Sequence, residues 1–199
     1  MNLPNKLTIS RIVLAFVCML LVFCRGIGAK AGALSVFLVA SITDFCDGYL
    51  ARRYHLTSDF GRLMDPIADK ILVISLFLAF VELRIIPAWM VVLIIARELV
   101  ITGLRLLAAA KGVVLTAAQG GKHKTVSQIV AIVLMLWFLL VREIRMAHGT
   151  WSADVALWWQ RVIWYFMLVT IGITVGSGLW YLWWHRSVWL NVGSPQKSR

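Results

Sequence analysis

Apolar residues along this chain are grouped into six long runs, separated by short polar or charged segments. Each run has about twenty residues, the length that an α-helix needs to cross the hydrocarbon core of a bilayer. Charged residues, Gly, Pro or aromatic residues bound the runs, as at the water interfaces of a membrane protein. We therefore expect an all-α, polytopic membrane protein with six transmembrane helices. The expected spans are Leu7–Phe23, Ala31–Arg53, Arg62–Leu83, Ala88–Ala110, Thr125–Val141 and Trp158–Trp184.

Basic residues are distributed unevenly between the two ends of these expected helices. An even number of spans puts both termini on one side, where twelve Lys and Arg residues fall, against six on the other side. Because cytoplasmic segments are enriched in Lys and Arg, we expect the termini in the cytoplasm. We expect residues 1–190 to form one transmembrane domain, with its first span retained because it is too long for a signal-peptide core. Residues 191–199 are polar and are expected to form a disordered cytoplasmic tail.

The composition of the chain bears on whether it binds nucleic acid or membrane lipid. The chain has 20 Lys and Arg against 9 Asp and Glu, which gives a formal net charge of +11. Such an excess can indicate nucleic acid binding, but basic residues beside apolar spans are more typical of membrane orientation and of contact with anionic lipid. We expect membrane lipids and no nucleic acid as partners. The cysteines, Cys18, Cys24 and Cys46, lack metal-ligand spacing and predict neither a disulfide framework nor a zinc site.

Four aspartates interrupt the apolar pattern where the second and third spans meet. At about 100° per residue, each span presents them on one stripe with small residues. The stripe of the second span consists of Asp44, Asp47, Gly48 and Ala51. The stripe of the third span consists of Gly61, Asp65 and Asp69. Pro66 either kinks the third helix or starts it with Asp65 as its cap. A short connection makes the two spans antiparallel neighbours, so their acidic ends are expected to meet.

The cost of burying these acids favours a metal site. One Asp at mid-span costs about 2.5–3.5 kcal/mol, so four facing lipid cost on the order of 10 kcal/mol as an upper limit. Shared protons, cationic partners or bound divalent metal relieve such a cluster. Hard carboxylate oxygens suit Mg²⁺ or Mn²⁺, and four of them suit two ions. For a single carboxylate, a structural ion pair or a position in the wet interface is the simpler interpretation. The small residues would by themselves fit close helix packing.

The complete pattern carries a resemblance. The chain resembles, at every position, the signature of the CDP-alcohol phosphotransferase family of membrane enzymes. Its pattern is Asp44-x2-Asp47-Gly48-x2-Ala51-Arg52-x8-Gly61-x3-Asp65-x3-Asp69. The segments LPNKLTISR, ARELVITGLR and GGKHKT are similar, in order and spacing, to segments of the bacterial phosphatidylglycerophosphate synthases in that family. The resemblance implies transfer of a phosphatidyl group from CDP-diacylglycerol to glycerol 3-phosphate, giving phosphatidylglycerophosphate and CMP. It also implies six transmembrane helices, a homodimer and an active site open to the cytoplasm. The compactness of the chain favours a bacterial inner membrane over an organelle of bacterial descent.

The resemblance also implies roles for individual residues. Asp69 is the expected general base that takes the proton of the attacking hydroxyl. The expected ligands of two Mg²⁺ or Mn²⁺ ions are Asp44, Asp47, Asp65 and Asp69. The expected CDP-binding residues are Asp44, Asp47, Gly48, Ala51, Arg52 and Gly61. In this set the small residues admit the nucleotide and Arg52 pairs with phosphate.

Glycerol 3-phosphate is a dianion, so its site needs cations. The expected acceptor-phosphate residues are Arg97, Arg105, Lys122 and Lys124. A pair between Arg97 and Glu98 is the alternative for Arg97, but residues adjacent in sequence do not face each other on a helix. For the other three residues, anchoring at the cytoplasmic membrane surface is the alternative.

Two other functions remain open from the sequence. A relative with a different acceptor, such as inositol phosphate, serine or phosphatidylglycerol, would share the aspartate pattern. Neutral or zwitterionic acceptors would not need the basic cluster, whereas inositol phosphate would. A divalent-cation transporter would also place aspartates inside the membrane. The clustering of the acids toward one face, with no matching broken helix in the other half of the chain, argues against a transporter.

Overall fold

The computed structural model describes residues 3–54, 59–110 and 120–186, and within them the side chains of residues 10–43, 70–109 and 124–186. Every element in these ranges is an α-helix, and none of their residues is in a β-strand. The helices are α1 (Leu3–Phe23), α2 (Ile27–Tyr54), α3 (Asp59–Glu82), α4 (Ala88–Ala110), α5 (Gly120–Ala147) and α6 (Ala153–Trp184). The predicted all-α class and the six helices, in the expected order, are confirmed.

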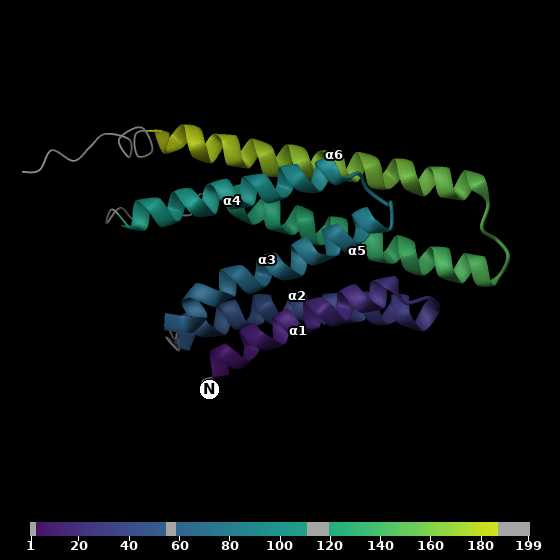
Figure 1. The fold of residues 1–199 in the computed structure, drawn as a ribbon, viewed down its shortest axis with the longest axis horizontal. Helices are drawn as coiled ribbons and strands as arrows, with labels where there is room; N and C mark the ends of the chain where they lie inside the picture. Colours follow the sequence, from purple (N-terminus) through teal and green to yellow (C-terminus); the bar gives the residue numbers. More distant parts are fainter. Residues whose placement is uncertain (1–2, 55–58, 111–119, 187–199) are drawn as a thin grey trace, which may run out of the picture.

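The helices run along the long axis of the molecule (Figure 1). Helix α1 packs on α2 and α3, and α5 packs on α2, α3 and α6, while α4 lies against α3 and α6. In Figure 1, α1 begins and α6 ends at the same end of the bundle, where α2 also ends and α3 begins. The end of α2 and the start of α3 therefore lie at the same end of the bundle, and both helices pack on α1.

Several helices extend beyond the predicted apolar runs. Helix α5 continues past Val141 through the charged turn that contains Arg142 and Glu143, because charged side chains reach water without ending a helix. Helix α6 starts before its apolar run because Ser152 caps it: the backbone N–H of Val155 donates to Ser152 Oγ at 3.4 Å. The apolar runs thus predicted the apolar part of each helix, but not the residues at which the helix begins and ends.

Large apolar side chains from five helices fill the centre of the bundle. Helices α2 to α6 each contribute one large side chain that is at most 1% exposed. In chain order these are Phe37, Phe77, Met90, Met135 and Met167. They belong to one continuous core cluster, to which α1 also contributes. In a lipid environment such a core is stabilised by close van der Waals packing, because lipid tails are as apolar as the core itself.

The outer surface fits a membrane protein. Two of the described helices are long and apolar enough to cross a bilayer, Lys124–Ala147 within α5 and Ala153–Trp184, which is α6. Along α6, large aromatic side chains are exposed toward both ends, as in the aromatic belts of membrane helices. The exposed tryptophans of α6 are Trp158, Trp164, Trp180, Trp183 and Trp184. These features are typical of a membrane protein.

Candidate active site

The four aspartates lie within α2 and α3 at matching distances from the connected ends of these helices. Asp44 is ten residues before the end of α2 and Asp69 ten residues after the start of α3. At 1.5 Å per residue, both are about 15 Å from the connection. Asp47 and Asp65 are seven and six residues from the same ends, or about 10 Å. The four acids therefore lie on the same stretch of the two helices, within about 15 Å of the connected ends.

Helix α3 begins at Asp59, which decides between the two predicted roles of Pro66. Pro66 lies inside the helix, in its eighth position, and Asp65 is a helical residue instead of a cap. Both acids of α3 are thereby kept on one continuous helix.

The side chains of these acids lie outside the described side chains, and so do those of the nucleotide candidates. The expected nucleotide residues Gly48, Ala51 and Arg52 are on α2, and Gly61 is on α3. Among the side chains that the structure describes, no three His, Cys, Asp or Glu residues are placed to hold a metal ion. The metal and nucleotide sites therefore stay predictions. These predictions are supported by the finding that all four aspartates lie on α2 and α3, near the ends that are adjacent in sequence.

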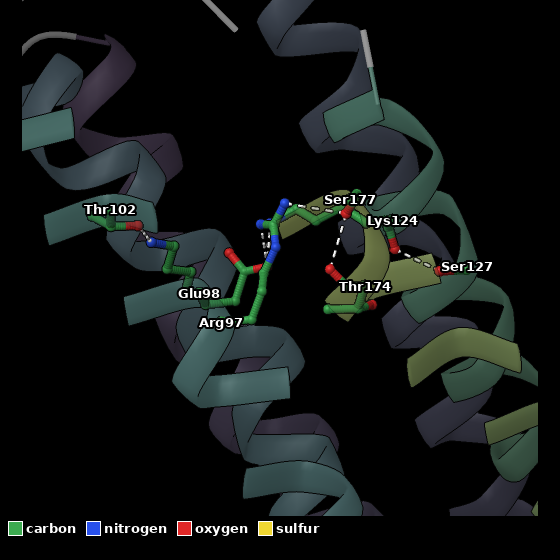
Figure 2. A network of polar contacts seen from close by, with 8 residues as sticks. Arg97, Glu98, Thr102, Lys124, Ser127, Thr174 and Ser177 are labelled. Carbon is green, nitrogen blue, oxygen red and sulfur yellow. Dashed lines mark hydrogen bonds and ion pairs between the residues drawn. The ribbon is translucent and has the colours of Figure 1, made fainter. Parts of the chain in front are cut away.

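The described part of the site is a buried polar network centred on Glu98 of α4 (Figure 2). Arg97 Nη1 donates to Glu98 Oε1 at 3.2 Å, and the side chains of Arg97 and Glu98 are only 10% and 11% exposed. The expectation that these two residues do not pair is wrong. Although their Cα–Cβ bonds diverge by about 100°, both side chains are long and flexible enough for their ends to meet. The pair neutralises charge inside the bundle.

Lys124 of α5 joins the same carboxylate. Its Nζ donates to Glu98 Oε1, the oxygen that also accepts from Arg97, and the Lys124 side chain is 14% exposed. Lys124 is the fifth residue of α5, because that helix begins at Gly120. The network thus brings together two of the four predicted acceptor-phosphate residues. Lys122, also on α5, lies outside the described side chains.

A third helix, α6, contacts Arg97 on its other side. Arg97 Nη2 donates to Ser177 Oγ at 3.3 Å, and Ser177 Oγ in turn donates to the backbone oxygen of Thr174 at 2.9 Å (Figure 2). Ser177 was not among the predicted site residues. A serine in an apolar run has no charge or motif that distinguishes it from a packing residue, so the sequence carried no signal for it.

Lys70 of α3 connects the acidic helices to this network. It follows Asp69 directly in sequence, and its Nζ donates to Thr102 Oγ1 of α4, one turn after Glu98. Lys70 and Glu98 are charged residues inside apolar runs, which is the signal that could have identified them. The bond ties α3, just after its last aspartate, to the helix that carries Arg97.

Arg105 lies further along α4 and has a different neighbour. Its guanidinium carbon is 5.3 Å from the centre of the Tyr181 ring of α6, a cation–π contact. It is eight residues beyond Arg97, about 12 Å along the helix. The structure therefore places Arg105 beside the network, and not on the Glu98 carboxylate.

The network carries more positive than negative charge. Among the side chains described here, Arg97 and Lys124 bond to the carboxylate of Glu98, while Lys70 bonds to Thr102 one turn away. Buried charges need partners of opposite sign, and Arg and Lys bind phosphate groups strongly. The site is therefore suited chemically to bind a phosphate group next to the acidic helices.

Comparison with known proteins agrees with this chemistry. The family model described as CDP-alcohol phosphatidyltransferase matches residues 1–173. A CDP-diacylglycerol–glycerol-3-phosphate 3-phosphatidyltransferase of Bacillus subtilis is 41% identical over 170 residues, which are 79% of this chain and 86% of that protein. A probable phosphatidylglycerophosphate synthase of Mycobacterium tuberculosis is 44% identical over 138 residues, 68% of this chain and 66% of that protein. A CDP-diacylglycerol–glycerol-3-phosphate 3-phosphatidyltransferase of Rickettsia typhi is 40% identical over 136 residues, 68% of this chain and 76% of that protein. The chain therefore belongs to the CDP-alcohol phosphatidyltransferase family.

Proposed function

We propose that this protein transfers the phosphatidyl group of CDP-diacylglycerol to glycerol 3-phosphate and releases CMP. The observation that carries the proposal is the similarity, at 41% identity over 79% of the chain, to a Bacillus subtilis protein named for this reaction. The buried cations around Glu98 support it, because this acceptor carries a phosphate group that needs them. The product is phosphatidylglycerophosphate, an anionic phospholipid precursor.

The acceptor would bind with its phosphate at the basic network. Arg97 and Lys124 come from different helices and meet at one carboxylate, so a phosphate arriving there finds donors on two sides. Arg105, beside them on α4, adds a further cation at the rim. Lys122 adds another on α5. The reacting hydroxyl of the acceptor would then lie toward α2 and α3, where the aspartates are.

The donor set on α2 and α3 fits a divalent metal. Four carboxylates at similar distances from the connected ends of these helices would supply hard oxygen ligands, which Mg²⁺ and Mn²⁺ prefer. The residues that would hold one or two such ions are Asp44, Asp47, Asp65 and Asp69. When bound, the ions neutralise the pyrophosphate of CDP-diacylglycerol and favour departure of CMP.

The chain's own residues bind and orient the two substrates and accept a proton. The hydroxyl oxygen of glycerol 3-phosphate forms a bond to the phosphorus that carries diacylglycerol, and the bond from that phosphorus to the oxygen of CMP breaks. The carboxylate of Asp69 takes the hydroxyl proton as the new bond forms. Gly48, Ala51 and Gly61 leave room for the cytidine and its phosphates, and Arg52 pairs with a phosphate. Holding both substrates in line provides much of the acceleration.

We propose that all six helices cross the inner (cytoplasmic) membrane of a bacterium, with both termini and the active site on the cytoplasmic side. The distribution of Lys and Arg along the chain supports this orientation. The shared end of α1, α2, α3 and α6 in Figure 1 is then the cytoplasmic end. Water-soluble glycerol 3-phosphate and CMP would enter and leave there. We further propose that the enzyme works as a homodimer, as the family resemblance implies.

One assay tests the proposed function. Purified protein in detergent is mixed with CDP-diacylglycerol and Mg²⁺ or Mn²⁺, and CMP release is followed with glycerol 3-phosphate, inositol phosphate, serine or phosphatidylglycerol as acceptor. We expect CMP only with glycerol 3-phosphate. CMP release that depends on another acceptor would overturn the acceptor assignment, and no release with any acceptor would overturn the reaction.

A further inference from the structure

Arg97 is held between α4 and α6 by contacts that fix its guanidinium on two sides. Its Nη1 donates to Glu98 Oε1 at 3.2 Å, within α4, and its Nη2 donates to Ser177 Oγ at 3.3 Å, on α6. The side chain is 10% exposed. Because a guanidinium is a rigid planar fork, two anchored nitrogens determine the plane and direction of the whole group.

Ser177 is itself fixed in the orientation that accepts a hydrogen bond. A serine hydroxyl has one proton to donate, and Ser177 gives it to the backbone oxygen of Thr174 at 2.9 Å. Its lone pairs are then left for Arg97. The backbone of α6 therefore orients the hydroxyl, and the hydroxyl orients the guanidinium.

Gly178 provides the space in which the Arg97 side chain lies. A Cβ added at Gly178 would be 2.8 Å from Arg97 Cγ and 3.2 Å from Arg97 Nε. The distance to Cγ is shorter than real Cβ atoms show, and the distance to Nε would need a small shift. Because Cγ is near the root of the arginine side chain, it has little freedom to move away. Any larger residue at position 178 would push Arg97 out of its place against α6.

We propose that Ser177 and Gly178 are positioning residues for the acceptor: they set the guanidinium of Arg97 in the direction from which it binds the phosphate of glycerol 3-phosphate. The proposal rests on the proposed function, and it adds α6 to a site whose recognised motifs lie on α2 to α5. Small errors in the position of a binding group weaken productive binding strongly. Helix α6 thereby takes part in acceptor recognition without touching the acceptor.

Gly178→Ala and Gly176→Ala form a matched pair of variants. Both replace a helical glycine of α6 by alanine, so both gain the same helix propensity. A Cβ at Gly176 meets nothing within 4 Å, whereas one at Gly178 meets Arg97. We expect Gly178→Ala to raise the KM for glycerol 3-phosphate roughly tenfold, as loss of a hydrogen bond to a charged group does. The KM for CDP-diacylglycerol and kcat at saturating acceptor should stay near the wild-type values, and Gly176→Ala should match wild type in all three.

Ser177→Ala and Ser177→Thr separate positioning from folding. Ser177→Ala removes the acceptor of the Arg97 bond and should raise the KM for glycerol 3-phosphate, whereas Ser177→Thr keeps a hydroxyl and should restore a value close to wild type. Thermal unfolding of each variant in detergent is measured in parallel. If Gly178→Ala does not fold, the two serine variants decide.

The outcomes are distinct. If wild type turns over with glycerol 3-phosphate but Gly178→Ala behaves like Gly176→Ala, or Ser177→Ala like wild type, the positioning role is wrong and the proposed function stands. If Ser177→Thr is as impaired as Ser177→Ala, the hydroxyl is not what positions Arg97, and the role is again wrong. If wild type itself shows no turnover with glycerol 3-phosphate, both the proposed function and the positioning role are wrong.

Discussion

Lys124 of α5 donates a hydrogen bond to the carboxylate of Glu98 of α4, so a single buried acid links two helices. The same oxygen also accepts from Arg97. Charges buried in a low-dielectric interior are stable only when they are paired, and removing one partner leaves the others uncompensated. Glu98 therefore stabilises the fold as well as the site.

Glu98→Gln should destabilise the protein because it leaves the buried cations without their counter-charge. Breaking a buried ion pair from one side costs about 3–5 kcal/mol. We expect a clear fall in the thermal unfolding midpoint in detergent. The matched control is Glu82→Gln, at the exposed end of α3, which should unfold close to the wild-type temperature. Equal midpoints for the two variants would mean that Glu98 does not neutralise the network.

The helices of this fold were predictable because apolar runs of membrane length are unambiguous. The same runs predicted helix ends less well: α5 begins at Gly120 and not at Thr125, and α6 begins at Ala153 and not at Trp158. Helix ends depend on caps such as Ser152 and on charged residues that extend a helix into water, and neither changes the hydrophobic pattern.

The parts of the candidate site that could be predicted are those with charged residues or with the long motif. The motif predicted the four aspartates from Asp44 to Asp69, whose side chains lie outside those described. Charge drew attention to Arg97 and Lys124, which both donate to Glu98 in the structure. The neutral Ser177, which contacts Arg97 across 80 positions of sequence, depends on how α4 packs against α6. Single-sequence patterns describe one helix at a time and contain no such information.

Lys30 has a structural role that the pattern of basic residues did not predict. It counts among the cations on the side away from the termini, yet it is only 4% exposed. Its Nζ donates to the backbone oxygens of Val22 at 2.5 Å and Cys24 at 2.8 Å, where α1 ends. Lysine side chains cap helix carbonyls in this way and interact favourably with the helix dipole.

Lys30→Met should therefore destabilise the protein while leaving the kinetic constants unchanged. Two carbonyls lose a charged donor, and each such bond contributes about 1.5–3 kcal/mol. We expect a lower unfolding midpoint in detergent and an unchanged KM for glycerol 3-phosphate. Arg25→Met, at an exposed position in the same turn, is the control that loses charge without losing these bonds. A midpoint for Lys30→Met at or above that of Arg25→Met would contradict the capping role.

Removal of divalent metal should stop the reaction. The four aspartates repel one another without cations between them, and the pyrophosphate adds further negative charge. We expect a chelator to abolish CMP release and added Mg²⁺ or Mn²⁺ to restore it. In Asp44→Asn, the metal concentration for half-maximal rate should rise at least tenfold, since one of the few ligands is lost. A chelated enzyme that still releases CMP at the full rate would rule out the metal site.

Arg105→Ala should weaken acceptor binding without disturbing the donor. Arg105 lies on the Tyr181 ring, and under the proposed function its charge would attract the acceptor phosphate. We expect the KM for glycerol 3-phosphate to rise roughly fivefold to tenfold, with the KM for CDP-diacylglycerol unchanged. Arg186→Ala, which removes an exposed arginine from the ring of Trp183, is the control and should match wild type. An acceptor dependence unchanged in both variants would remove Arg105 from the site.

Asp69→Asn should nearly abolish turnover in a protein that still folds. The amide keeps the shape of the carboxylate but takes no proton, and a positioned general base contributes about 10²–10⁴-fold to a rate. We expect a loss of this size in kcat, together with an unfolding midpoint near wild type, because asparagine has almost the same volume. Asp154→Asn, in the first turn of α6, makes the same chemical change away from the site and should keep full activity. Full activity in Asp69→Asn would show that another group takes the proton of glycerol 3-phosphate, and the search for that base would then turn to the other three aspartates of α2 and α3.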